Sequence, residues 1–98
     1  MGPDEMYTNC VGRVQAQSVA SGQARALSAL TWVPAWNANA KMAKILATVD
    51  IAVCEVNGQT AGANDMPLYA KQTGTTLCPV SCSIYMPTTG NVTVTLWS

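Results

Sequence analysis

The sequence predicts a mainly β fold, a small antiparallel sandwich or barrel of five to six short strands that ends in a C-terminal hairpin. Three observations predict it. Residues 48–56 are dense in β-branched side chains, residues 91–97 alternate apolar with polar side chains, and turn signals rich in Gly, Pro and Asn separate the segments. The 98 residues suit a single domain spanning residues 1–98, in which the polar residues 1–9 form a loose N-terminal arm.

The first half of the chain is compatible with strands and with helices. Residues 11–20 alternate in the manner of a strand. Residues 24–33 also alternate, but their Ala, Arg and Leu residues are good helix formers. Residues 34–39 contain Pro and Asn and predict a connection. The alternative fold is therefore α+β, with residues 11–48 largely helical and packed on a C-terminal sheet.

Residues 41–58 are the most ambiguous segment. A helical stripe at i, i+3, i+4 and i+7 is formed by Met42, Ile45, Leu46 and Val49. The β-branched residues that follow favour a strand. We therefore expect a helical turn or two up to Ala47, a strand over residues 48–56, and a tight turn at Asn57 and Gly58. Residues 59–67, rich in Gly, Ala and Asn, predict a surface loop.

The C-terminal residues 75–98 predict the clearest pair of strands. Residues 76–86 and 91–97 both alternate, and the turn at residues 87–90 contains Pro and Gly. We expect the two strands to pair as a hairpin with one face in the core. The inward residues of that face would be Cys78, Val80, Cys82, Ile84 and Met86 on the first strand and Val92, Val94 and Leu96 on the second. A shorter strand is expected over residues 68–71, before the hairpin.

The four cysteines of this small chain suggest two disulfides. If residues 76–86 are extended, the Cα atoms of Cys78 and Cys82 lie roughly 13 Å apart, whereas a disulfide needs them within about 7 Å. Each of these two cysteines would therefore bond to Cys10 or to Cys54, and not to the other. Buried free thiols are the alternative. The same spacing disfavours zinc, since two thiolates on one zinc lie about 4 Å apart, so neither a metal nor a cofactor is predicted.

Side chains that carry catalytic chemistry are scarce. The chain has no histidine, which is the commonest general base, so a Ser-His-Asp or Cys-His arrangement cannot be built. Asp50 and Glu55 would point to opposite faces of one strand, and Asp50 is expected to face solvent. We therefore predict no catalytic residue and no enzymatic activity.

The charge pattern limits the partners that the protein can bind. Five basic and five acidic residues give a net charge of zero, and no basic segment is present to bind nucleic acid. No apolar run is long enough to insert into a membrane. The expected partners are proteins. Trp32, Trp36 and Trp97 are the candidate interface residues, and a place in the core is their alternative role.

Low charge and the missing catalytic set favour a structural or assembly protein. We expect a phage coat, decoration or fibre-associated subunit of a virion, whose partners are copies of itself or other subunits. The alternative is a secreted binding module, held together by disulfides, that recognises a receptor or cell-surface partner. The given chain starts with no signal peptide, and we expect it in a virion or outside the cell.

Overall fold

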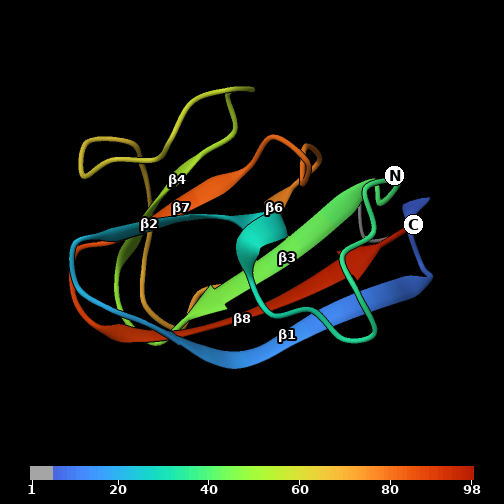
Figure 1. Cartoon of the computed structure of the whole chain (residues 1–98), viewed down its shortest axis with the longest axis horizontal. Helices are drawn as coiled ribbons and strands as arrows, with labels where there is room; N and C mark the ends of the chain where they lie inside the picture. The colour runs from blue at the N-terminus through green and yellow to red at the C-terminus, as the bar shows by residue number, and fades with distance from the viewer. Residues whose placement is uncertain (1–5) are drawn as a thin grey trace.

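The computed structural model describes residues 6–98. In this part of the chain, eight strands form two four-stranded antiparallel sheets that face each other as two layers (Figure 1). The strands are β1 (Cys10–Val19), β2 (Gln23–Ala26), β3 (Met42–Ala47), β4 (Ile51–Cys54), β5 (Met66–Leu68), β6 (Gly74–Thr76), β7 (Ser83–Met86) and β8 (Gly90–Trp97). A short 3-10 helix, η1 (Leu27–Ala29), follows β2. The predicted β-sandwich is confirmed, but the predicted number of five to six strands is too low, and the α+β alternative is wrong.

The strand order shows how the chain is folded. β1 pairs with β8, β2 with β7, β3 with β6 and β4 with β5, as if the chain first formed one long hairpin centred on residues 55–65. β8 also pairs with β3, and β7 also pairs with β4, which rolls this hairpin into two sheets. The resulting orders, β1-β8-β3-β6 and β2-β7-β4-β5, are those of a jelly roll.

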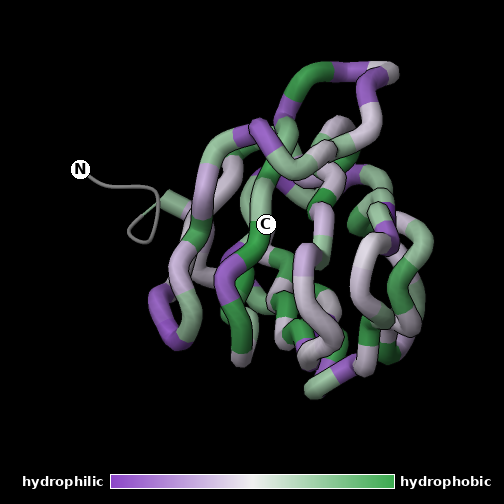
Figure 2. The backbone as a smooth tube through the Cα atoms, turned by 90° about the vertical axis from the view of Figure 1, so that its left-hand side faces the viewer, coloured by the Kyte–Doolittle hydropathy of each residue, from purple (hydrophilic) through white to green (hydrophobic). Residues whose placement is uncertain are grey.

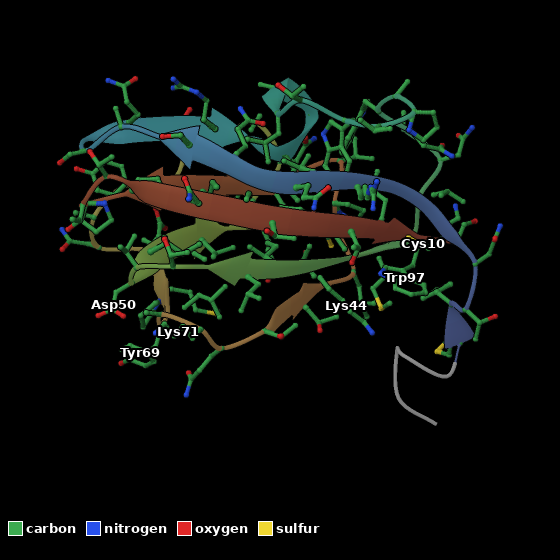
Figure 3. The ribbon with its side chains drawn as sticks, turned by 90° about the horizontal axis from the view of Figure 1, so that it is seen from below. Cys10, Lys44, Asp50, Tyr69, Lys71 and Trp97 are labelled. Atoms are coloured by element: carbon green, nitrogen blue, oxygen red, sulfur yellow. The ribbon has the colours of Figure 1, made fainter. Side chains whose placement is uncertain are left out.

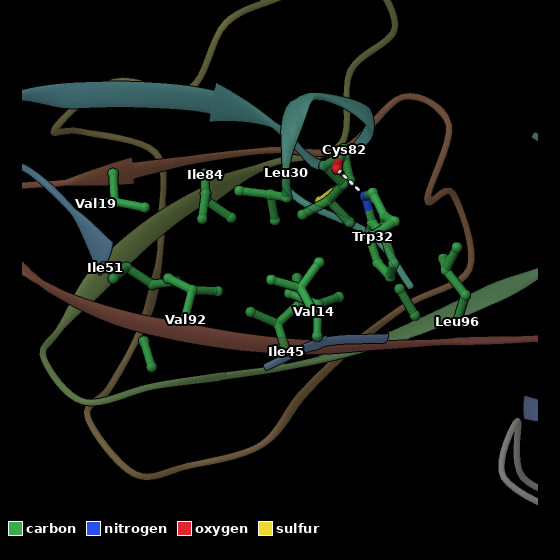
Figure 4. Close-up of a cluster of buried hydrophobic side chains, with 14 of the residues drawn as sticks. Val14, Val19, Leu30, Trp32, Ile45, Ile51, Cys82, Ile84, Val92 and Leu96 are labelled. Atoms are coloured by element: carbon green, nitrogen blue, oxygen red, sulfur yellow. Dashed lines mark hydrogen bonds between the residues drawn. The ribbon is translucent and has the colours of Figure 1, made fainter. Parts of the chain in front are cut away.

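The core lies between the two sheets and is formed by the inward face of each strand. Hydrophobic and hydrophilic residues alternate along the chain, as Figure 2 shows, so that one face of each sheet is apolar. Figure 4 shows side chains from the two layers pointing toward one another. The first sheet contributes Val14, Ile45, Val92, Val94 and Leu96, and the second contributes Ile51, Ile84 and Met86, all of them at most 3% exposed. Burial of this apolar surface is the main stabilising contribution to the sandwich.

A β-bulge at Ala16 changes which side chains of β1 point toward the core. Val14 pairs with Val94 and Gln17 pairs with Val92, so two residues of β1 oppose the single residue Thr93. Ala16 has a φ of 48°, and its N–H donates to the Thr93 hydroxyl at 3.1 Å. The extra residue reverses which positions of β1 face inward. Val14 before the bulge and Val19 after it therefore both point into the core.

The predicted helical turns before Ala47 are wrong. Residues 42–47 form β3, which lies between β8 and β6 in the middle of its sheet. Ala43 and Ile45 point inward and are at most 2% exposed. Pairing on both edges and burial of this face outweigh the helix propensity of Ala, Lys and Leu. The strand predicted over residues 48–56 is shorter, because residues 48–50 form the turn between β3 and β4.

The predicted C-terminal hairpin is also wrong. Residues 76–86 do not form one strand, because a turn in which the Ser81 N–H donates to the Cys78 carbonyl at 3.0 Å separates β6 from β7. Cys78 and Val80 are therefore exposed, not inward. β7 and β8 belong to different sheets, so their inward faces meet across the core. Alternation predicts which residues face inward, but it does not specify which strand lies alongside.

The remaining predicted segments agree only in part with the observed ones. Residues 34–39 are a connection, and Gly58 forms the expected turn with a φ of +79°. The strand predicted over residues 68–71 is wrong except at Leu68, because β5 covers Met66–Leu68 and the chain turns after it. Of the predicted N-terminal arm, residues 1–5 lie outside the described residues, and Asn9 exchanges two backbone hydrogen bonds with Ser98, at 3.2 and 2.8 Å.

Gly90 is a position where the fold requires a residue without a side chain. A Cβ there would lie 2.7 Å from Val49 Cγ2 and 3.0 Å from Thr48 Oγ1. We expect Gly90→Ala to lower the free energy of unfolding by about 1–3 kcal/mol, because the β3–β4 turn must move. Urea unfolding followed by circular dichroism measures this. Gly62→Ala, whose Cβ would have its nearest neighbour at 3.9 Å, is the control, and an equal loss in both variants would show that the close contact at Gly90 is not the cause.

Candidate functional site

A groove of about 80 Å³ opens between the edge strands β5 and β6, where the two sheets come together at one side of the sandwich. β5 is an edge of one sheet and β6 is an edge of the other. The groove is lined by Ile45, Val53, Glu55, Met66, Pro67, Leu68, Gly74, Thr75 and Thr76. The lining is mostly apolar, and Glu55 is its one titratable side chain.

Glu55 is held in place at the groove by a buried neighbour. Its side chain is exposed, and its Oε2 accepts a hydrogen bond from the Thr76 hydroxyl. Thr76 is only 2% exposed, and its Oγ1 in turn accepts the Cys78 N–H at 3.1 Å. The groove therefore presents one fixed negative charge within an apolar lining. Among residues 6–98, no group of three or more Cys, Asp or Glu side chains is arranged to hold a metal ion.

Four large, exposed apolar side chains lie in, or close in sequence to, the segments that line this groove. They are Val56, Met66, Leu77 and Val80, which are 53–67% exposed and which we call the rim patch. Val56 follows Glu55, Leu77 follows Thr76, and Met66 lines the groove itself. The rim patch holds half of the large, exposed hydrophobic side chains in the described part of the chain. Apolar side chains concentrated in one region are a sign of an interaction site.

Sequence reasoning misses this site. It predicts a surface loop over residues 59–67 and places Val80 in the core. The groove is formed by four strands that lie far apart in sequence, so no local pattern indicates it. Pro79 is the available signal, because a proline in the middle of an alternating segment argues against one continuous strand.

All four cysteines are free in the structure, so the predicted disulfides are not formed. Cys10 and Cys78 are exposed, whereas Cys54 and Cys82 are buried. Cys82 belongs to the core, and Cys54 pairs with Ser83, whose side chain contacts the β4–β5 loop. That loop is fixed by the Ala61 N–H, which donates to the Ser83 hydroxyl at 2.9 Å.

The acidity of the Cys82 thiol is strongly altered by its surroundings. The pKa of the Cys82 thiol is raised to about 12, mainly because the thiol is buried and also because the Glu55 carboxylate disfavours the thiolate, while a hydrogen bond with Thr76 partly opposes both effects. The thiol is therefore protonated at neutral pH. A protonated, buried thiol is a poor nucleophile, so Cys82 acts as a small core residue.

Thiol labelling tests this arrangement. In the native protein under reducing-agent-free conditions, we expect Cys10 and Cys78 to react rapidly with a maleimide, because both are exposed. Cys54 and Cys82 should react only when the protein unfolds, since they are buried. Intact mass would show two labels at first and four in denaturant. Native protein that reacts with no label at all would contradict the presence of free, exposed thiols.

The three tryptophans occupy different environments. Trp32 is 8% exposed, and its Nε1 donates to the Leu27 carbonyl at 2.6 Å, so it is a core residue (Figure 4). Trp36 is half-buried against it, with ring centroids 5.3 Å apart. Trp97 is half-buried on β8, where Lys44 Nζ lies 4.8 Å from its ring centroid. Of the three candidate interface residues, Trp36 and Trp97 have accessible surface to offer a partner.

Asp50 has a structural contact. It is exposed, as expected, and its Oδ1 accepts the Ala70 N–H at 2.8 Å. Figure 3 shows Asp50 with Tyr69 and Lys71 at the end of the molecule away from Cys10. Its carboxylate therefore fixes the chain after β5 and takes no part in the groove.

Comparison with known proteins gives no match: no protein-family model, no curated protein and no solved structure resembles this chain significantly. Within the described residues, no helix is long and apolar enough to cross a membrane.

Proposed function

We propose that this protein is a non-enzymatic structural subunit of a virion-type assembly, a phage coat, decoration or fibre-associated protein that acts through protein–protein contacts. The rim patch is the observation that carries the proposal. Exposed apolar side chains are unfavourable in water, and contact with another protein removes them from it. In a chain with only 10% charged residues, this patch has few neighbouring charges to keep separate copies apart.

The jelly-roll topology adds support by analogy. Viral capsid domains use this architecture, as do lectins and cupins. Because one fold serves several functions, the choice among them depends on the site. The groove offers apolar side chains and one carboxylate, which suits contact with a protein surface better than catalysis.

The secreted binding module is the less favoured function. That hypothesis rests on an even number of cysteines that could form disulfides. The four free thiols remove this support. We therefore also propose a place in a virion, with copies of the chain or other assembly subunits as partners.

Substitution in the rim patch tests the proposal. Met66 is 67% exposed, so Met66→Asp should leave the fold intact and place a charge in the contact surface. In sedimentation velocity we expect the wild-type protein to form oligomers and Met66→Asp to sediment as a 10.3 kDa monomer. Tyr69→Asp is the matched control, since Tyr69 is 56% exposed and lies outside the groove. Equal sedimentation of wild type and Met66→Asp would count against the rim patch as the contact surface.

A further inference from the structure

A second groove, of about 400 Å³, lies on the opposite edge of the first sheet. It is lined by Cys10, Val11, Gly12, Arg13, Val33 and Pro34. The segment around Val33 lies alongside β1, because Arg13 and Val33 exchange two backbone hydrogen bonds of 2.9 Å. The backbone of β1 is therefore already paired at this point, and what the groove offers to a partner is side chains. Val33 is 58% exposed there.

The two grooves are at opposite edges of one sheet and have opposite charges. The order β1-β8-β3-β6 places β1 and β6 at the two outer positions (Figure 1). We call the groove beside β1 the β1 groove and the groove between β5 and β6 the β6 groove. Arg13 is the one charged side chain in the lining of the β1 groove, and Glu55 is the one charged side chain in the lining of the β6 groove. Within residues 6–98, neither of them forms an ion pair.

Each groove has exposed apolar side chains beside its one charged side chain. The lining of the β1 groove includes Val33 and Pro34, and the lining of the β6 groove includes Met66. An ion pair surrounded by apolar contact is protected from water and salt, and opposite charges fix the register of the two surfaces. The two edges are therefore complementary in charge and similar in apolar character.

We infer that the protein assembles head to tail, with the β6 groove of one copy bound to the β1 groove of a second copy and Glu55 paired with Arg13. This inference rests on the proposed function and specifies its partner. Because each copy presents both surfaces, the contact is heterologous. Such contacts close into a ring or continue as a filament, and they do not produce an isolated two-fold dimer.

Charge reversal tests the inference. Arg13→Glu and Glu55→Arg should each place like charges across the contact and weaken self-association at least about tenfold. The double variant Arg13→Glu/Glu55→Arg should assemble again, because the pair is restored with its polarity reversed. An equimolar mixture of the two single variants should also assemble, with the two kinds of copy alternating. Lys71→Glu, an exposed loop residue that lines neither groove, is the control for a change of net charge and should assemble as the wild type does.

The pattern of outcomes separates this inference from the proposed function. If the wild-type protein assembles and the single reversals assemble equally well, copies meet through other surfaces, and the inference fails while the proposed function stands. If the wild-type protein is monomeric at all concentrations, both fail. Glu55→Arg also removes the acceptor for the Thr76 hydroxyl, so Glu55→Gln, which keeps an acceptor, separates loss of charge from loss of structure. Glu55→Gln should weaken assembly less than Glu55→Arg. Assembly of the equimolar mixture of Arg13→Glu and Glu55→Arg would show that both single variants are folded, because misfolded variants could not restore the contact.

Discussion

Replacing Trp32 by alanine should lower the free energy of unfolding by about 3–5 kcal/mol. Domains of this kind are stable by only about 5–15 kcal/mol, so the variant would lose a large share of its free energy of unfolding. Trp32 is 8% exposed and packs in the core cluster, and its Nε1 donates to the Leu27 carbonyl at 2.6 Å. The substitution therefore leaves a large cavity and removes one of the two hydrogen bonds that the Leu27 carbonyl accepts, the other coming from the Leu30 N–H at 3.2 Å. Urea unfolding monitored by circular dichroism measures the loss.

Two further substitutions identify the cause of this loss. Trp32→Phe keeps most of the apolar ring but removes the donor, so it should cost about 0.5–1.5 kcal/mol, because the Leu27 carbonyl still accepts the Leu30 N–H. Trp36→Ala should cost less than Trp32→Ala, because Trp36 is only half-buried. If Trp32→Ala and Trp36→Ala had the same effect, Trp32 would not be a core residue.

Alkaline pH should destabilise the native protein through Cys82. Burial raises the pKa of this thiol from 9.0 to about 12. Above pH 9 the unfolded chain loses this proton whereas the native protein retains it, so the unfolded state becomes relatively more favourable. The stability is fully present below pH 9 and is lost as the pH rises toward 12. Between pH 8 and pH 11, the expected loss is about 3 kcal/mol.

The variant Cys82→Ala isolates this effect from other alkaline titrations. It will be less stable than the wild type at pH 8, because a buried side chain is shortened. Its further loss of stability between pH 8 and pH 11 should be smaller than that of the wild type by about 3 kcal/mol. Urea unfolding at the two pH values gives, for the wild type and for the variant, the slope of the free energy of unfolding against pH. Equal slopes would show that Cys82 does not remain protonated in the folded protein.

The local pattern of the sequence predicts the composition of the core better than the pairing of the strands. The inward facing of Val92, Val94 and Leu96 is confirmed, because period-two alternation with β-branched residues is typical of a strand with one buried face. The same alternation in residues 83–86 wrongly predicts a hairpin, since β7 lies in the other sheet. Two apolar faces can meet side by side or across a core, and only the whole topology decides between them.

Backbone irregularities and long-range pairing account for the other errors. The bulge at Ala16 has no sequence signal, since alanine is not a residue that favours positive φ. The strand β3 is made of good helix formers, and only its two neighbouring strands explain its conformation. The groove between β5 and β6 depends on the same long-range pairings. A single sequence can therefore predict the class of fold but not the place of the site.

The molar mass of the wild-type protein in solution tests the central claim most directly. Multi-angle light scattering over a wide range of protein concentrations would measure it. If the protein is a structural subunit that binds its own copies, the mass should be a multiple of 10.3 kDa or should rise with concentration. A constant mass of 10.3 kDa up to the highest concentration reached would contradict self-assembly.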